Sequence, residues 1–427
     1  MTELIKLKLQ IAQGHYEEEL KAVYLSKDEI IRQRERFKSL LNNFEELFGA
    51  AKAIELFSAP GRTEICGNHT DHNHGRVLAA AINLDAIAAA AKNNENICRV
   101  KSEGYSMDVV ELDNLMVMPH EHHRSVALLR GVCAGFQSRG YKVGGFDATT
   151  ASDVLSGSGL SSSAAFEVLL GTILNHLYND GKVSAVEIAQ IAQYAENEYF
   201  GKPCGLMDQT ASSVGGFVAI DFKDSKAPVI EKVDFDFSAC GHALCIVDTK
   251  GSHSGLTGEY AAVKEEMESV AAVFNENSLR SVPKEAFESK LAELRQSVGD
   301  RAVLRAFHFY SENERVLFAS EALSKGDFEC FKDFVIESGQ SSYMYNQNVY
   351  LGKVPKSQPV SVALCLSEQL LKGKGAWRVH GGGFAGTIQA FVHLDLLQEY
   401  ISRMDAVYGT DSCYVLSIRP AGGVKIL

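Results

Sequence analysis

The stretch Ser156-Gly157-Ser158-Gly159-Leu160-Ser161-Ser162-Ser163-Ala164-Ala165 joins a glycine- and serine-rich turn to residues with helical spacing. Glycines let backbone N–H groups approach an anion, and the start of a helix adds unpaired N–H groups and the positive end of its dipole. Serine hydroxyls can donate to phosphate oxygens or bind a hard cation. The stretch therefore indicates a phosphate-binding loop, although a plain turn with a serine helix cap is the alternative. It is not the Walker pattern, because no Gly-Lys-Ser or Gly-Lys-Thr follows.

A second stretch, Gly61-Arg62-Thr63-Glu64-Ile65-Cys66-Gly67-Asn68-His69-Thr70-Asp71-His72-Asn73-His74-Gly75, concentrates polar groups between apolar runs. Burying so many polar side chains is unfavourable unless they bind something. Their mixture of donors and acceptors suits a polyhydroxylated ligand. A solvated loop is one alternative, and a metal site is another, although the histidines match no familiar zinc spacing.

Two further motifs lie downstream. Cys204-Gly205-Leu206-Met207-Asp208-Gln209 follows a helix predicted over residues 184–199, which carries Glu196. Asp208 could act as a base if a nearby cation kept it ionised, and otherwise it is a structural residue of a turn. The run 378–386 contains three consecutive glycines and predicts either a close approach of two backbones or a simple strand–turn–helix corner.

Composition narrows the class of protein. A chain of 427 residues suggests two domains, and the formal charge of −12 argues against a nucleic-acid partner. The nine cysteines are scattered without Cys-x-x-Cys spacing, which favours reduced thiols in the cytoplasm. Charged residues near the N-terminus argue against a secretory signal. Asn83 and Asp85 interrupt the most apolar run, residues 77–91, so we expect a soluble protein without a membrane partner.

Periodicity gives a coarse map of the chain. Residues 1 to about 50 predict surface helices packed on the domain behind them, with the clearest helix over 28–48. An apolar strand is expected to end at Ala59, because Pro60-Gly61 follows. Further helices are predicted at about 258–275, 284–298 and 305–323, with a domain boundary near residue 238.

Together and in this order, the four motifs resemble those of the GHMP kinase superfamily, and of the galactokinases within it. The resemblance runs from about residue 30 to the C-terminus. It implies a two-domain α+β fold with a ribosomal protein S5 domain 2-like N-terminal domain and a ferredoxin-like C-terminal domain. The implied ranges are an extension over 1–27, a sugar- and phosphate-binding domain over 28–238 and a C-terminal domain over 239–427, with the active site in the cleft between the domains.

The resemblance also implies an activity and its residues. The activity is ATP-dependent phosphorylation of the anomeric hydroxyl of galactose, with Asp208 as the base and Arg62 between Asp208 and the γ-phosphate. Ser163 and Glu196 would hold Mg2+. The implied ATP-binding residues are Gly157, Ser158, Gly159, Leu160, Ser161, Ser162 and Ser163. The implied sugar-binding residues are Asn68, His69, Thr70, Asp71, Gly205 and Tyr260.

The sequence departs from the family pattern in the sugar motif. It has Glu64 where the family has Asn, Asn68 where the family has Glu, and His72 where the family has Tyr. Residues four apart are neighbours on a helical turn, so we predict that the exchange preserves a hydrogen-bonded Asn–Glu pair. Alternatively, it adapts the site to another galactose-like sugar, such as galacturonate or N-acetylgalactosamine. The residues after Tyr260 and the segment 343–348 also differ from the family pattern.

Two classes of function remain open. The first is an active sugar-1-kinase, and the second is a non-catalytic galactokinase-like sensor that binds sugar and ATP. The phosphate loop, Arg62, Glu196 and Asp208 are all present, which favours the enzyme. A mevalonate or homoserine type of kinase fits the His69-Thr70-Asp71 cluster less well. The expected ligands are a sugar and ATP, and the expected state is a monomer or a weak homo-oligomer.

Overall fold

The computed structural model describes residues 3–50, 53–155, 159–251 and 256–427. The chain forms two compact units. Unit 1 contains Met1–Arg62, Ala81–Gly216 and Arg419–Leu427, and unit 2 contains Thr63–Ala80 and Phe217–Ile418. Both units are discontinuous in sequence, because strands β1 (Glu55–Cys66) and β2 (Arg76–Lys92) each contribute residues to both. The domain ranges 28–238 and 239–427 follow the chain continuously and stay a prediction.

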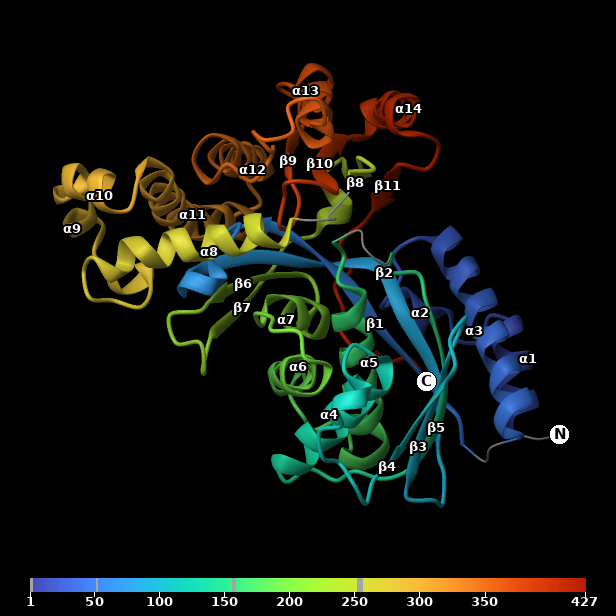
Figure 1. Ribbon diagram of the computed structural model, residues 1–427. Coiled ribbons are helices and arrows are strands. Elements are labelled where there is room, and N and C mark those ends of the chain that lie inside the picture. Colours follow the sequence, from blue (N-terminus) through green and yellow to red (C-terminus); the bar gives the residue numbers. More distant parts are fainter. Residues whose placement is uncertain (1–2, 51–52, 156–158, 252–255) are drawn as a thin grey trace. The chain divides into compact units, whose positions relative to one another are not determined.

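Unit 1 is built on one mixed sheet with strand order β12-β1-β2-β5-β3-β4. Strands β3 and β5 pair in parallel, whereas β2 with β5, β3 with β4 and β1 with β12 pair antiparallel. Helices α1 to α3 lie on one face of this sheet and α4 to α7 on the other (Figure 1). The remaining elements of unit 1 are β3 (Ile97–Ser102), β4 (Met107–Glu111), β5 (Phe146–Ser152), β12 (Val424–Lys425), α1 (Glu3–Ala12), α2 (Glu17–Lys21), α3 (Lys27–Phe48), η2 (Pro119–Glu121), α4 (Ser125–Ser138), α5 (Ser162–Asn179), α6 (Ala185–Tyr194), the π-helical turn η3 (Ala195–Phe200) and α7 (Met207–Val214).

The N-terminal helices are part of the core of unit 1. Ser26 caps α3 by accepting a hydrogen bond from the backbone N–H of Glu29. The buried side chains of α3 recur at helical spacing and join Leu4 of α1 and Leu20 of α2 in one apolar cluster. The predicted helix over 28–48 and the predicted packing of this region are therefore confirmed.

Strand β1 corrects one expectation, because it continues through Pro60-Gly61 to Cys66 instead of ending at Ala59. Proline interrupts a sheet only where its missing N–H is needed. On one side β1 pairs with β12 at Phe57 and Ser58 alone, so Pro60 lies beyond that ladder.

A buried charge cluster fixes distant segments of unit 1. The Asp85 carboxylate, which is 0% exposed, accepts hydrogen bonds from Tyr24 (2.6 Å), Arg36 (2.6 Å), Arg419 (3.1 Å) and Ser58. Burial alone would raise the pKa of Asp85, but Arg36 and Arg419 lower it below its usual value. The carboxylate thus stays charged and joins α3 to β2 and the C-terminal segment.

Unit 2 contains a second sheet, with order β11-β8-β10-β9. In addition, β6 and β7 form a hairpin, and β6 pairs antiparallel with residues 76–80 of β2. Helices α13 and α14 share an apolar cluster with β8 and β10. The elements of unit 2 are η1 (Asp71–Asn73), β6 (Phe217–Asp221), β7 (Val229–Val233), η4 (Phe237–Ala239), β8 (His242–Asp248), α8 (Thr257–Ala272), η5 (Leu279–Ser281), α9 (Lys284–Ser289), α10 (Leu291–Ser297), α11 (Asp300–Ser324), α12 (Phe328–Ser341), the π-helical turn η6 (Ser342–Asn346), α13 (Pro359–Leu371), β9 (Ala376–Val379), β10 (Thr387–His393), η7 (Leu394–Leu396), α14 (Leu397–Tyr408) and β11 (Cys413–Leu416).

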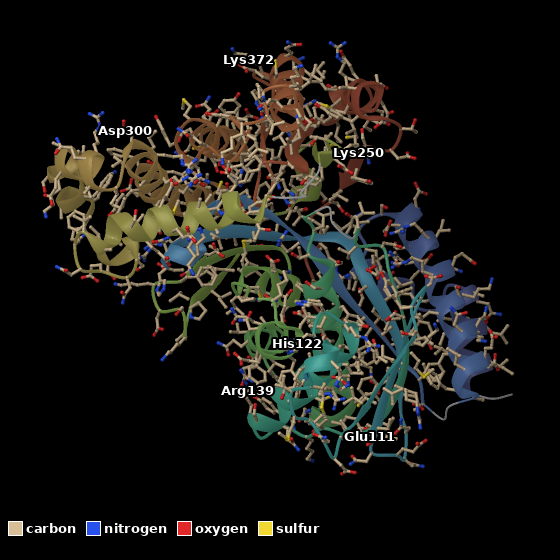
Figure 2. All side chains as sticks on the ribbon, in the orientation of Figure 1. Glu111, His122, Arg139, Lys250, Asp300 and Lys372 are labelled. Atoms are coloured by element: carbon tan, nitrogen blue, oxygen red, sulfur yellow. The ribbon has the colours of Figure 1, made fainter. Side chains whose placement is uncertain are left out.

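The predicted helices of the second half are present with shifted bounds. Residues 284–298 form the two short helices α9 and α10, and α11 begins at Asp300, five residues before the predicted start (Asp300 and the surrounding side chains are shown in Figure 2). Within the described ranges, no helix is both long and apolar enough to span a bilayer.

Loss of the Asp85 charge should destabilise the fold. Asp85→Asn would leave two guanidinium groups in the core of unit 1 without a counter-charge, and we expect a loss of about 3–5 kcal/mol in the free energy of unfolding. Urea denaturation followed by circular dichroism measures this. Because the pKa of Asp85 is depressed, its contribution is present above the pKa of the unfolded chain and is lost as the pH falls through the folded pKa.

Asp180→Asn is the matched control, because Asp180 lies in an ion pair whose carboxylate is 81% exposed. Its effect should stay within about 0.5 kcal/mol. Equal effects of the two substitutions would contradict a structural role for the Asp85 cluster.

Candidate active site

Close contact between β1 and the serine-rich loop positions the candidate site in unit 1. A Cβ atom on Gly61 would lie 2.8 Å from the carbonyl oxygen of Leu160, so only glycine fits there. The next residue, Arg62, donates its backbone N–H to that carbonyl (3.1 Å). The loop therefore lies directly against the strand that carries Arg62.

Arg62 and Asp208 form a bidentate ion pair. Nε of Arg62 donates to Oδ1 of Asp208 (2.7 Å) and Nη2 donates to Oδ2 (2.8 Å). Nη1 of Arg62 also donates to the carbonyl of Gly159. The Arg62 side chain is 9% exposed and that of Asp208 30%, so the carboxylate keeps an accessible side. Two parallel charge-assisted bonds fix both side chains in position.

The Ser161 side chain hydrogen-bonds to Asp208 and does not cap helix α5. It stands at the cap position of α5 with a left-handed φ of 58°, which is unfavourable for a residue other than glycine. Its hydroxyl makes no capping bond and donates to Oδ2 of Asp208. The helix-cap alternative for this serine is therefore wrong, and the first-turn N–H groups of α5 lack intrahelical partners.

The carboxylate of Asp208 is held in its charged form. Burial would raise the pKa of Asp208, but the Arg62 guanidinium, the Ser161 hydroxyl and the charge of Lys202 together lower the pKa below its usual value. A carboxylate that stays ionised in a half-buried position can accept a proton from a hydroxyl group placed against it.

A second carboxylate, Glu196, lies near the start of α5. It is 2% exposed and stands on the π-helical turn that ends α6, a feature often found at functional sites. Its Oε1 accepts from the hydroxyl of Ser163 (3.1 Å) and from Nζ of Lys202 (2.9 Å). A hydroxyl and a carboxylate oxygen at this distance are hard donors of the kind that Mg2+ binds.

Two buried side chains behind Glu196 were missed by the sequence analysis. The Gln209 amide donates to Oε2 of Glu196 (2.8 Å) and to Oε2 of Glu167 (3.2 Å). Burial, followed by the charge of Glu196, raises the pKa of Glu167 well above its usual range. The sequence signal for Glu167 was a glutamate among the apolar residues of α5.

A hollow of about 360 Å³ opens beside α5 in unit 1. Its lining includes Phe166 of α5, Ser125 at the start of α4 and residues of the β3–β4 connection. The lining residues are Ser102, Tyr105, Ser106, Asp108, His123, Arg124, Ser125 and Phe166.

The polar motif over 63–75 lies in unit 2, where Glu64 and Asn68 are hydrogen-bonded. Nδ2 of Asn68 donates to Oε1 of Glu64 (2.9 Å), which confirms the predicted contact between these side chains. Arg378, which is 0% exposed, pairs with the same carboxylate oxygen (3.0 Å).

Protein partners occupy the whole amide of Asn68. Nδ2 also donates to the carbonyl of Gly381 (2.8 Å), and Oδ1 accepts from Asn348 (2.8 Å) and from Ser342 (3.3 Å). An amide has two donor hydrogens and two acceptor lone pairs, so all four are used. A direct sugar contact by Asn68 would need one of these bonds to break.

Two other predicted sugar residues of unit 2, His69 and Tyr260, contact the last glycine motif. His69 contacts the carbonyl of Gly382 through Nε2 (2.9 Å), and Tyr260 donates to the carbonyl of Gly383 (2.9 Å). The Thr70 hydroxyl lies within hydrogen-bonding distance of the carbonyls of Gly67 and Arg76. Asp71 is half-buried at the start of η1.

A Cβ atom on Gly383 would collide with the backbone of Asn348, so the predicted close approach of two backbones is confirmed.

The predicted phosphate-binding and catalytic residues lie in one unit, and most of the predicted sugar-binding residues lie in the other. Gly159, Leu160, Ser161, Ser162, Ser163, Glu196, Gly205 and Asp208 belong to unit 1 with Arg62, whereas Gly157 and Ser158 lie outside the described residues. Over the described ranges, no three His, Cys, Asp or Glu side chains form a group that could hold a metal ion.

Known families match two stretches of the chain. Residues 42–92 match the galactokinase galactose-binding signature, and residues 127–216 match the N-terminal domain of GHMP kinases. The chain is 32% identical over 387 residues to a galactokinase of Streptomyces coelicolor, covering 90% of this chain and 97% of the relative. It is 35% identical over 359 residues to a galactokinase of Glaesserella parasuis, covering 82% and 88%.

Solved structures agree with these matches. The Lactococcus lactis galactokinase complexed with galactose superposes with a TM-score of 0.74 at 25% identity, covering 90% of this chain and 98% of that one. A mevalonate kinase has a TM-score of 0.60 at 14% identity, over 85% and 99%, and supports the fold alone. The expected two-domain GHMP kinase fold is confirmed, and ATP is the co-substrate of such kinases. The chain therefore belongs to the galactokinase family of the GHMP kinases.

Proposed function

We propose that this protein transfers the γ-phosphoryl group of ATP to the anomeric hydroxyl of galactose, giving galactose 1-phosphate and ADP. The observation that carries the proposal is the bidentate Arg62–Asp208 pair beside the serine-rich loop. It supplies an ionised base and a fixed positive charge in one place. Phosphoryl transfer needs little else besides correct positioning, because its catalysis is mostly electrostatic.

Asp208 takes the proton of the sugar hydroxyl as the oxygen attacks the γ-phosphorus. A new O–P bond forms, the bond to the β-phosphate oxygen breaks, and ADP leaves with the electron pair. The proton remains on Asp208 until it passes to solvent. Arg62 keeps Asp208 ionised before the step and stabilises the charge on the transferring group during it.

The nucleotide is held by the loop and by the start of α5. The N–H groups of the first turn of α5, with Ser162 and Ser163, bind phosphate oxygens, as do Gly157 to Ser161 by resemblance to the family. The hollow that contains Phe166 and Tyr105 accommodates the nucleoside, since aromatic faces suit a base.

Ser163 and Glu196 hold Mg2+ in this proposal. The fit rests on their two oxygen atoms 3.1 Å apart and on a buried carboxylate that benefits from a counter-charge. Mg2+ bound there would neutralise charge on the phosphate oxygens during transfer.

We propose that His69, Asp71, Gly205 and Tyr260 contact the sugar. Asn68 and Thr70 stay proposed sugar-binding residues, and a direct contact would require rearrangement of the hydrogen bonds that engage their polar atoms within the protein. They hold the loop in shape. The Glu64–Asn68 exchange favours a second candidate substrate, another galactose-like sugar such as galacturonate or N-acetylgalactosamine.

We further propose that the protein acts in the cytoplasm as a monomer or weak homo-oligomer, without a nucleic-acid or membrane partner. The sugar- and phosphate-binding domain would comprise 28–238, and the C-terminal domain 239–427.

The activity is tested by ADP release over galactose, N-acetylgalactosamine, galacturonate, arabinose and glucose. We expect turnover of galactose, and we expect Asp208→Asn to reduce kcat by about 10³-fold because the base is lost. ATP affinity, measured by calorimetry, should change little, and Asp180→Asn should behave as wild type. Binding of sugar and ATP without turnover of any sugar would favour a sensor instead.

Arg62 should control the acid limb of the pH–rate profile. In Arg62→Gln the burial of Asp208 is no longer opposed by the guanidinium, so the pKa of Asp208 rises. The acid limb of kcat/KM should therefore move to higher pH, with a lower plateau. An unshifted limb would show that Asp208 is not the titrating base.

Glu64 and Asn68 should be energetically coupled. Asn68→Glu places two carboxylates together in a buried site, and Glu64→Asn leaves Arg378 without its counter-charge, so each single variant should lower the melting temperature. The double exchange should restore an Asn–Glu pair, with a coupling energy of about 1 kcal/mol or more in a double-mutant cycle. If Asn68→Glu alone raised galactose turnover while Glu64→Asn had no effect, the two positions would not form a compensating pair.

A further inference from the structure

The two oxygens of Glu196 have separate partners. Oε2 accepts from the Gln209 amide (2.8 Å), which fixes the plane of the carboxylate. Oε1 faces the start of α5 and accepts both from Ser163 (3.1 Å) and from Lys202 (2.9 Å). The Lys202 ammonium therefore occupies the side of the carboxylate on which a cation shared by Ser163 and Glu196 would bind.

Lys202 can leave this position, whereas Glu196 cannot. The Glu196 side chain is 3% exposed and anchored by Gln209, but the Lys202 side chain is 59% exposed. A lysine of this kind keeps its stem on the protein while its charged head moves in solvent. Lys202 lies in the loop between η3 and α7, and its charge also acts on Asp208.

We propose that Lys202 is a phosphate-binding residue that neutralises Glu196 in the free enzyme and moves to a phosphate oxygen of ATP when Mg2+ takes its place on Oε1. The inference rests on the proposed function, since it requires Mg2+ and a nucleotide at the start of α5. A divalent cation and an ammonium repel each other at one oxygen, and the incoming phosphates offer the displaced ammonium a new counter-charge.

The plain alternative is a surface salt bridge with no functional role. Lys182 and Asp180 form such a pair at 3.1 Å, with both side chains more than three-quarters exposed (77% and 81%). The Lys202 pair differs because its carboxylate is buried and is shared with Ser163. Lys182→Met is therefore the matched control for Lys202→Met.

The experiment measures two binding events apart from turnover. Calorimetry gives the affinity for ADP in the presence of Mg2+, and electron paramagnetic resonance gives the affinity for Mn2+ alone. In Lys202→Met we expect ADP binding to weaken about tenfold through loss of a charge-assisted contact. Mn2+ binding should become tighter, because no ammonium competes for Glu196. In Lys202→Met the KM for ATP should rise, because nucleotide binding is weaker, while the KM for the sugar stays unchanged. Lys202→Arg should restore most of the ADP affinity.

Several results would overturn the inference. ADP affinity in Lys202→Met equal to that in Lys182→Met would leave an ordinary salt bridge. Weaker Mn2+ binding in Lys202→Met would mean that the lysine positions Glu196 instead of competing with the metal. If either of these two results is obtained and the wild-type protein still phosphorylates galactose, only the proposed role of Lys202 is wrong. Wild-type protein that binds neither Mg2+ with ADP nor Mn2+ would overturn the proposed function as well.

Discussion

The ion pair of Arg62 and Asp208 is the constraint around which the site in unit 1 is arranged. A buried guanidinium and a half-buried carboxylate stabilise each other only if their geometry is fixed. That requirement accounts for the glycine at 61, which brings β1 against the loop, and for the strained backbone of Ser161, whose hydroxyl is thereby directed at Asp208. The ion pair thus joins the strand and α7 to the loop, which it contacts at the Gly159 carbonyl and the Ser161 hydroxyl.

Unit 1 contains a second group of buried charges besides the Arg62–Asp208 pair. Glu167 and Glu196 are both buried and share the Gln209 amide, and Lys202 brings a positive charge to Glu196. The raised pKa of Glu167 relieves part of the repulsion, since a protonated carboxyl carries no charge. Glu196 remains the member of the pair that accepts from Lys202 and Ser163. This surplus of buried acidic groups supports the proposal that Glu196 binds a cation.

Local patterns predicted the contacts that depend on short spacing or on motif order. The hydrogen bond between Glu64 and Asn68 was predicted, but the helical spacing given for it was wrong, because Glu64 lies in strand β1 and Asn68 in the turn that follows the strand. The pairing of Arg62 with Asp208 came from the family resemblance. The partners Arg378, Asn348 and Gln209 could not be predicted, because their contacts depend on how distant segments pack. The discontinuous units escaped prediction for the same reason, since a strand that serves two cores has no separate signature in an apolar pattern.

The environment of Asn68 limits what the sugar motif can reveal about specificity. A single exchange at 64 or 68 would disturb Arg378, Ser342 and Asn348 together, because all of them bond to the pair. Asn348 belongs to the segment 343–348, where the sequence departs from the family pattern, and Ser342 directly precedes that segment. The motif and this segment therefore differ from the family as one hydrogen-bonded set. A change in sugar preference would consequently arise from the shape that this set gives to the loop, and not from the loss of one carboxylate at position 68.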